Sequence, residues 1–210
     1  MVFAKEPVAG KVKTRLARTL GAERAAELYA AFLEDTLRTA RSVASAERCL
    51  SYAPASASGR FAALDPEATL LPQPEGDLGA RLASAFERAF ALGHTRCVAL
   101  GSDAPHLAPR VLEELFDALA TSPIAVLPTD DGGYAAIGLD APRPELFERI
   151  DWSTPRVLAQ TLERARRIGL EVRSLPATFD VDGPADLDRL RELLAKEGPV
   201  RCPATARLLA

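Results

Sequence analysis

The chain has 210 residues, of which 48% are hydrophobic and 26% charged, a composition typical of a folded globular domain and not of a disordered or membrane-spanning chain. The formal net charge of −3 gives no general attraction to nucleic acid, although a local basic cluster can still hold a small phosphorylated ligand. The first residues carry no export pattern, and the 3 cysteines fit neither a disulfide framework nor a Cys-x-x-Cys site. We therefore expect a cytoplasmic protein that binds neither nucleic acid nor membranes.

Apolar spacing predicts strands and helices that alternate along the chain. Short apolar runs typical of strands lie at 1–4, 49–53, 69–71, 97–100, 124–127, 134–139 and 172–175. Stripes with three-and-four spacing predict helices at 25–40, 78–90, 111–119, 157–168 and 187–194. This alternation indicates an α/β fold with a mostly parallel sheet flanked by helices on both faces, whose ligands bind at the carboxyl ends of the strands. We expect one domain over residues 1–198 and a tail over 199–210.

The loop after the first strand is strongly basic. It reads Lys-Glu-Pro-Val-Ala-Gly-Lys-Val-Lys-Thr-Arg over residues 5–15. Lysine and arginine neutralise phosphate oxygens, glycine lets the backbone approach an anion, and amides at a helix start point towards it. The loop is not a P-loop, because Pro7 and Val12 stand where that motif needs glycine. The loop therefore predicts a site for the phosphates of a nucleotide, and the alternative is a solvated basic turn. The candidate phosphate-binding residues are Lys5, Gly10, Lys13, Thr14 and Arg15.

A second glycine-rich segment precedes the helix predicted at 78–90. It holds Gly76, Asp77, Gly79 and Arg81. Asp77 suits the N-cap of that helix. The flanking glycines and Arg81 equally suit contact with a nucleotide base or phosphate, so both interpretations stay open.

Carboxylates follow two of the predicted strands. Asp103 comes after the strand at 97–100, and Asp180 and Asp182 follow the strand at 172–175. Magnesium prefers hard oxygen ligands and commonly joins one or two carboxylates to substrate phosphates. Caps or turns are the alternative for Asp103 and Asp182, but capping does not explain Asp180. We predict that the metal-binding residues are Asp103, Asp180 and Asp182, with Asp103 and at least one of the other two binding one Mg2+ or Mn2+ ion beside the diphosphate.

An Asp-Gly-Gly-Tyr segment at 131–134 joins two predicted strands. Asp-Gly-Gly is a strong hairpin signal, and the pair of glycines also lets an acceptor lie against the backbone while Asp131 accepts a proton. Trp152 can stack on a sugar, although a tryptophan is more often part of the core. The candidate acceptor-binding residues are Gly132, Gly133, Tyr134 and Trp152, and the candidate catalytic residues are Asp103 and Asp131.

Taken in order, these segments resemble a bacterial family of proposed nucleotide-diphospho-sugar transferases, which includes glycosyltransferase-like proteins linked to arsenosugar biosynthesis. The resemblance rests on six segments that span nearly the whole chain, namely Lys5–Leu16, Gln73–Arg81, Ser102–Pro105, Asp131–Tyr134, Trp152-Ser153 and Asp180–Asp182. It implies the glycosyltransferase-A fold, which nucleotide-sugar transferases share with sugar and phospholactate nucleotidyltransferases.

The resemblance implies a transferase and leaves the bond that breaks open. A glycosyltransferase moves a sugar from a nucleotide-diphosphate donor to a small-molecule acceptor. A nucleotidyltransferase joins a nucleoside triphosphate to a phosphorylated small acceptor and releases pyrophosphate, and the basic loop suits that reaction equally well. A third possibility is a nucleotide-binding module without turnover. The expected partners are a nucleotide sugar or nucleoside triphosphate and a small-molecule acceptor.

Overall fold

The computed structural model describes all residues from Met1 to Ala210 and contains one mixed sheet. Its seven strands lie in the order β3-β2-β1-β4-β6-β5-β7. The strands are β1 (Val2–Lys5), β2 (Cys49–Ala53), β3 (Thr69–Pro72), β4 (Cys97–Gly101), β5 (Ile124–Pro128), β6 (Tyr134–Leu139) and β7 (Val172–Ser174). Only β6 runs antiparallel to its neighbours. The carboxyl ends of the other six strands therefore meet at one edge of the sheet.

Helices cover both faces of this sheet. The central strands alternate between the two cores, because Val98 and Leu100 of β4 pack on one side while Cys97 and Ala99 pack on the other. The first core lies under α2 (Ala22–Arg41), α3 (Ser58–Leu64) and α5 (Pro109–Ala118), and the short 3-10 helix η1 (Ala55–Ala57) leads into α3. The second core lies under α4 (Leu78–Ala91), the 3-10 helix η2 (Pro144–Phe147) and α6 (Val157–Arg167).

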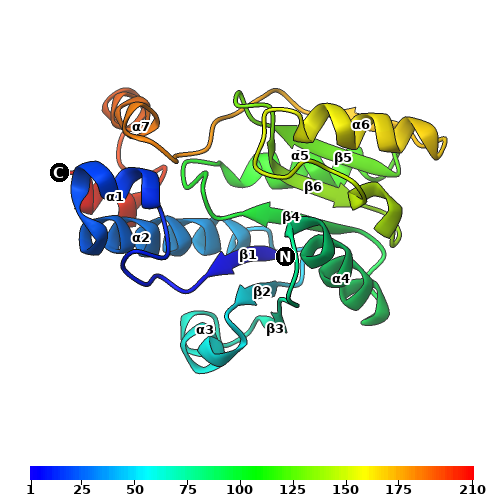
Figure 1. Ribbon diagram of the computed structural model, residues 1–210, viewed down its shortest axis with the longest axis horizontal. Helices are drawn as coiled ribbons and strands as arrows, with labels where there is room; N and C mark the ends of the chain where they lie inside the picture. Colours follow the sequence, from blue (N-terminus) through cyan, green and yellow to red (C-terminus); the bar gives the residue numbers. More distant parts are fainter.

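A third apolar cluster lies beyond the carboxyl ends of the strands. It joins α2 to α1 (Thr14–Leu20) and α7 (Pro184–Glu197) through Leu16, Phe32 and Leu187. Figure 1 shows α1 and α7 gathered at the end of the molecule towards which β1 runs. The strand-to-helix loops therefore run between the sheet and this helical group, where ligands of parallel sheets are expected to bind.

The predicted fold class is confirmed. Each predicted strand and helix is present, and the Asp-Gly-Gly segment is the turn of an antiparallel hairpin between β5 and β6. The sequence pattern missed the short helices α1, α3 and α8 (Pro203–Leu209). Each of these three helices has 7 residues, too few for an apolar stripe to repeat. No helix has the length and apolar character that a membrane crossing needs.

The tail after residue 198 ends in a helix fixed to α2 by one buried carboxylate. Asp35 is 0% exposed, and its two oxygens accept hydrogen bonds from the backbone N–H groups of Ala204 at 3.1 Å and Thr205 at 2.8 Å. Amides in the first turn of a helix have no partner within that helix, so a carboxylate from elsewhere is a strong cap. Asp35 therefore docks α8 against α2.

We expect Asp35→Ala to lower the free energy of unfolding by about 3 kcal/mol, because two buried amides lose a charged acceptor. Urea unfolding measures this loss. Glu34→Ala is the matched control, since Glu34 pairs with Arg207 of the same helix at 3.3 Å, but both side chains are more than half exposed. The control should lose less than about 1 kcal/mol. Equal losses in the two variants would show that Asp35 does not hold the tail.

Candidate active site

Four of the loops that carry predicted site residues meet at the carboxyl edge of the sheet. The loop after β1 carries Lys13, the loop after β4 carries Asp103, the β5–β6 turn carries Asp131, and the segment after β7 carries Asp180 and Asp182. The Val181 N–H donates to the Asp103 carbonyl at 2.8 Å, which joins the second and fourth of these segments directly. Residues far apart in sequence therefore share one site.

The centre of the site is a buried lysine between two carboxylates. The Lys13 Nζ lies 2.5 Å from an Asp103 oxygen and 2.7 Å from an Asp182 oxygen. The Lys13 side chain is only 4% exposed, whereas each of the two aspartates is 42% exposed. One ammonium group thus neutralises two carboxylates that remain open to the cleft.

The third carboxylate, Asp180, has no such partner. Burial and the nearby charges of Asp103 and Asp182 raise the pKa of Asp180 to about 7, although Lys13 acts in the opposite direction. Asp182 differs, because its ion pair with Lys13 outweighs the effect of burial and lowers its pKa. For Lys13, burial acts to lower the pKa, but the two carboxylates reverse this effect and raise the net value. The cluster therefore holds more negative charge than one lysine balances.

Lys13 and Asp182 are each fixed by local backbone geometry. Lys13 has a φ of 46° and lies in the left-handed region, which a residue with a side chain rarely adopts outside strained, often functional sites. Its carbonyl begins α1 by accepting from Ala17 at 2.9 Å. The Asp186 carboxylate accepts from the N–H groups of Asp182 at 3.1 Å and Gly183 at 2.7 Å. Asp186 therefore holds the segment that carries Asp182.

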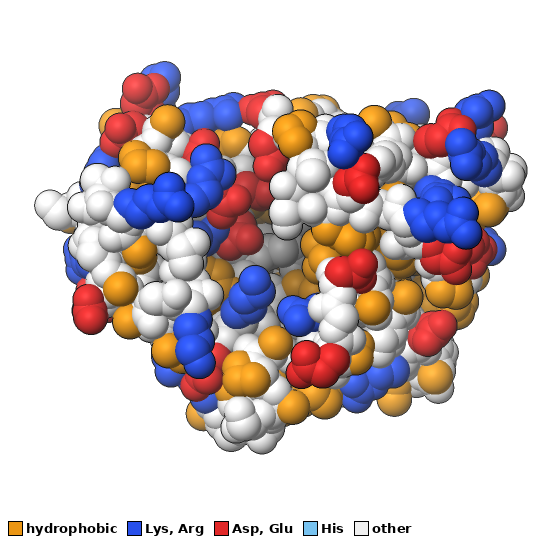
Figure 2. Space-filling model, in the orientation of Figure 1, with side chains coloured by type: hydrophobic (Ala, Val, Ile, Leu, Met, Phe, Trp, Pro, Cys, Tyr) orange, Lys and Arg blue, Asp and Glu red, His pale blue; other side chains and the backbone are white.

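Basic residues other than Lys13 remain exposed beside the cluster. Arg15 and Lys5 both contribute to the lowered pKa of Asp182, after the effects of burial and of Lys13 itself. The guanidinium of Arg15 lies next to the Gly183 backbone. Gly10 and Thr14 are exposed in the same loop. Figure 2 shows acidic side chains gathered in a hollow of the surface with basic side chains around it.

The β5–β6 turn holds Asp131 by its own hydrogen bonds. One oxygen of Asp131 accepts from the Thr129 hydroxyl at 2.6 Å and from the Gly133 N–H at 3.0 Å. Asp131 also contributes to the raised pKa of Asp180, so these two carboxylates are near enough to interact. The turn thus brings a fixed carboxylate, with its second oxygen free, to the edge of the acid cluster.

Gly132 is required by close packing against the loop before α6. Its φ is 89°, and an added Cβ would lie 2.1 Å from the Pro155 carbonyl oxygen. The Gly132 carbonyl accepts from the Leu158 N–H at 2.9 Å. The turn is therefore anchored to the start of α6.

Residues 76–81 contribute more to the capping and packing of α4 than to the lining of an open cleft. Asp77 is the N-cap of α4, and its carboxylate accepts from the Ala80 N–H at 2.9 Å. A Cβ on Gly79 would lie 2.8 Å from the Trp152 indole nitrogen, so close packing accounts for this glycine. Gly76 and Asp77 are exposed, and Arg81 lies 3.4 Å from the side-chain oxygen of Gln73.

Two of the candidate acceptor residues lie in apolar surroundings. Trp152 packs against the core under α4 and α6, and Tyr134 borders the same core. The Tyr134 hydroxyl is buried, and this burial raises its pKa. The structure therefore places Gly132 and Gly133 beside the acid cluster through Asp131, and it places Trp152 and Tyr134 mainly in the core.

Pattern reasoning missed the role of Tyr29 in supporting the first loop. The Tyr29 hydroxyl accepts from the Lys5 N–H at 2.9 Å and lies 2.8 Å from the Ser102 hydroxyl. Tyr29 belongs to the apolar face of α2, so its polar end gave no separate signal. It connects the loop after β1 to the loop that carries Asp103.

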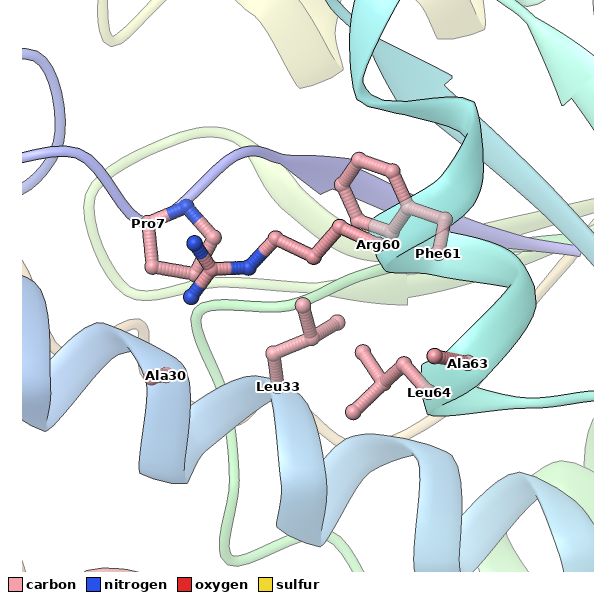
Figure 3. Close-up of a pocket in the computed structure, with 7 residues that line it drawn as sticks. All are labelled: Pro7, Ala30, Leu33, Arg60, Phe61, Ala63 and Leu64. Atoms are coloured by element: carbon pink, nitrogen blue, oxygen red, sulfur yellow. The ribbon is translucent and has the colours of Figure 1, made fainter.

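One apolar cavity lies away from this chemistry. It has a volume of about 250 Å³ and is lined by Pro7, Ala30, Leu33, Arg60, Phe61, Ala63 and Leu64. Figure 3 shows α2 and α3 forming its walls, with the Arg60 side chain reaching towards Pro7. None of the predicted site residues lines it. Its apolar lining is unsuited to a diphosphate, so the acid cluster remains the candidate site.

A divalent cation is chemically compatible with the acid cluster. The structure contains no group of three or more His, Cys, Asp or Glu side chains already arranged around a metal position. The donors nevertheless suit a hard cation, since they are carboxylate oxygens, and no hydrogen bond holds the Asp180 carboxylate. Lys13 occupies the position between Asp103 and Asp182, which leaves Asp180 as the carboxylate without a cationic partner.

Comparison with known proteins identifies relatives of this chain. Residues 36–154, more than half of the sequence, match a family described as "uncharacterized protein conserved in bacteria (DUF2064)". No curated protein matches the sequence. A proposed nucleotide-diphospho-sugar transferase from Desulfovibrio desulfuricans G20 is 35% identical over 99% of this chain and 91% of its own, with a TM-score of 0.92.

More distant structures share the fold alone. CMP:2-keto-3-deoxy-manno-octonic acid synthetase in complex with CTP is 16% identical over 93% of this chain and 97% of its own, with a TM-score of 0.59. Rv0371c from Mycobacterium tuberculosis H37Rv in complex with manganese is 22% identical over 91% of this chain and 96% of its own, with a TM-score of 0.56. The chain therefore belongs to the bacterial DUF2064 family and has the nucleotide-diphospho-sugar transferase fold.

Proposed function

We propose that this protein is a glycosyltransferase that moves a sugar from a nucleotide-diphosphate donor to a small-molecule acceptor with the help of a divalent metal. The observation that carries the proposal is the arrangement of Lys13 between Asp103 and Asp182, with Asp180 unpaired beside them. A diphosphate with its metal needs both basic and acidic groups in one cleft. The relative from Desulfovibrio desulfuricans G20 supports this reaction class, since it is itself proposed to act as such a transferase.

In this proposal the donor diphosphate lies between the first loop and the acid cluster. Arg15 and Lys5 are exposed and near Asp182, so they can bind phosphate oxygens. Asp103 and Asp180 would hold the metal, as Mg2+ or Mn2+, and the bound ion would neutralise charge on the leaving diphosphate. The neighbour with manganese supports divalent metal use in this fold. Lys13 keeps Asp103 and Asp182 oriented towards the cleft.

Asp131 is the proposed general base on the acceptor side. Its first oxygen is occupied by Thr129 and Gly133, so its second oxygen is free to accept the proton of an acceptor hydroxyl. The acceptor oxygen forms a bond to the anomeric carbon. The bond from that carbon to the phosphate oxygen breaks, and the nucleoside diphosphate leaves with the electron pair.

Nucleotidyl transfer is the second candidate, and the surplus of basic residues in the first loop favours it. An acceptor that is already a phosphate needs no base, so this reaction would leave Asp131 without a proton to accept. Incubation with magnesium or manganese and a panel of nucleotide sugars and nucleoside triphosphates separates the reactions. Sugar transfer releases a nucleoside diphosphate, and nucleotidyl transfer releases pyrophosphate. A protein that binds these compounds and releases neither product would be a binding module, which would overturn the proposal.

We expect Arg15→Ala to weaken nucleoside diphosphate binding by about 1–3 kcal/mol, the loss of one charge-assisted hydrogen bond. Arg15 is a cleaner probe than Lys13, because Lys13→Ala also removes the counter-charge of Asp103 and Asp182. Calorimetric titration measures the change. Arg18→Ala, an exposed arginine on the same helix, is the control and should bind normally. Unchanged affinity in Arg15→Ala would remove the arginine from the phosphate site.

We expect Asp180→Asn to stabilise the ligand-free protein progressively as the pH rises. The pKa of Asp180 is raised from 3.8 to about 7 in the folded chain, so its favourable contribution is complete below pH 3.8 and is lost as the pH rises through 7. The variant stays neutral at every pH. Its Tm relative to wild type should therefore increase between pH 4 and pH 7 by at least about 3 °C and then remain constant.

Thermal unfolding at a series of pH values, without metal, tests this expectation. Asp188→Asn is the control, because Asp188 is an exposed residue of α7 that pairs with Arg191 at 2.8 Å. A pH-independent difference between Asp180→Asn and wild type would contradict the charge crowding at the site.

We expect Asp131→Asn to lower kcat by about 100-fold or more while donor affinity changes little. The asparagine oxygen can still accept from Thr129 and Gly133, so the turn keeps its shape while the base is lost. Steady-state kinetics with varied donor and acceptor give the two parameters. Asp140→Asn is the control, because Asp140 follows the opposite end of β6. Equal losses of donor affinity and rate would place Asp131 in the donor site instead.

A further inference from the structure

Arg189 of α7 touches two segments that carry proposed site carboxylates. Its guanidinium pairs with the Asp130 carboxylate at 2.7 Å, and its central carbon lies 4.0 Å from the centre of the Phe179 ring. Asp130 is the residue before Asp131, and Phe179 is the residue before Asp180. One side chain therefore contacts the immediate neighbour of each of the two carboxylates, on the acceptor side and on the metal side.

The Phe179 ring is held on both faces. His106 stacks on it with ring centres 4.1 Å apart and an angle of 19° between the planes. Two planar groups so close to the same ring centre cannot share one face, so His106 and Arg189 lie on opposite faces. The His106 Nε2 lies 3.1 Å from the Thr178 hydroxyl, and burial lowers the pKa of His106 to about 4, so the imidazole is neutral in the stack. The neutral His106 ring thus supports one face of Phe179, and the charged Arg189 guanidinium packs on the other face.

The backbone between the two segments is already paired. The Thr178 N–H donates to the Pro128 carbonyl at 2.9 Å, and the Asp130 N–H donates to the Thr178 carbonyl at 3.1 Å. This pairing ends at Asp130, and no backbone hydrogen bond joins the segment carrying Asp131 to the segment carrying Asp180 beyond it. At the end of this backbone pairing, the Arg189 side chain contacts the side chains of both Asp130 and Phe179.

We propose that Arg189 is a positioning residue that sets the separation between Asp131 and Asp180, and so between the acceptor and the metal-bound donor. The proposal rests on the glycosyltransferase function proposed above. Arg189 does not touch substrate. It acts through Asp130 and Phe179, and a small displacement of a base from its acceptor lowers the rate strongly without an equal effect on binding.

Arg189→Ala tests the proposal, with Arg191→Ala as the matched control. Arg191 lies one half-turn further along α7 and pairs only with Asp188 of its own helix, at 2.8 Å. We expect Arg189→Ala to lower kcat about 10- to 100-fold, with the donor KM changed by less than about threefold, while the control behaves as wild type. Arg189→Lys keeps the charge but not the planar stacking, so its kcat should fall between those of wild type and Arg189→Ala.

A double-variant cycle identifies the partner through which Arg189 acts. If the ion pair transmits the effect, Asp130→Ala alone lowers kcat, and adding it to Arg189→Ala causes little further loss. Amide hydrogen exchange of residues 129–134 should be faster in Arg189→Ala than in the control, and this measurement needs no turnover. Full additivity would exclude transmission through the Asp130 ion pair and leave the Phe179 contact as the route, whereas exchange unchanged in Arg189→Ala would overturn the positioning role.

The outcomes for the two proposals are distinguishable. A wild-type protein that releases no nucleoside diphosphate from any nucleotide sugar refutes the proposed function, and the catalytic part of this inference with it. A wild-type protein that is active, with Arg189→Ala as fast as Arg191→Ala, refutes only the role of Arg189.

Discussion

The structure of the site depends on the interaction of one ammonium group with two carboxylates. A parallel sheet brings the ends of its strands to one edge, and in this chain those ends carry Asp103, Asp180 and Asp182. Three carboxylates in a partly buried space repel one another, and each loses hydration. Lys13 offsets this cost for Asp103 and Asp182 at 2.5 and 2.7 Å, and it adopts a left-handed backbone to do so. The surplus charge remains on Asp180.

The uncompensated negative charge on Asp180 determines which kind of ligand we expect the cleft to bind. In the proposed function, Asp180 and Asp103 bind an additional cation, and the exposed Arg15 and Lys5 bind an anion. A metal diphosphate satisfies both requirements at once. The antiparallel strand β6 adds the proposed acceptor side, because its hairpin turn brings Asp131 to the same edge. Gly132 against Pro155 and Asp130 against Arg189 fix that turn from two directions.

The sequence predicted the fold class, and it singled out the loops that the structure brings together in the candidate site, for physical reasons that act locally. Buried strands appear in the sequence as apolar runs. Amphipathic helices appear as stripes of apolar residues with three-and-four spacing, and these helices are α2, α4, α5, α6 and α7. Acidic residues after apolar strands predicted one shared edge for the candidate site, because all but one of the strands are parallel and their carboxyl ends lie together. The short helices α1, α3 and α8 lacked enough residues for a stripe to repeat.

Interactions between distant segments were beyond the sequence pattern. Lys13 was predicted to bind phosphate, but nothing in its loop indicates that its ammonium group would contact Asp182, 169 positions later. Asp35 looked like one polar residue within an apolar helix, and its role as a cap for α8 requires knowing where the tail docks. Gly79 suggested phosphate contact, whereas its close neighbour is Trp152. Such contacts depend on packing in three dimensions, which spacing along one segment does not specify.

The most direct test of the central claim is a crystal structure of the protein with Mn2+ and a nucleoside diphosphate, in which anomalous scattering locates the manganese. The account predicts manganese bound by Asp180 or Asp103, with the diphosphate between it and Arg15. Manganese and diphosphate bound elsewhere, with Lys13, Asp103, Asp180 and Asp182 unliganded, would contradict it.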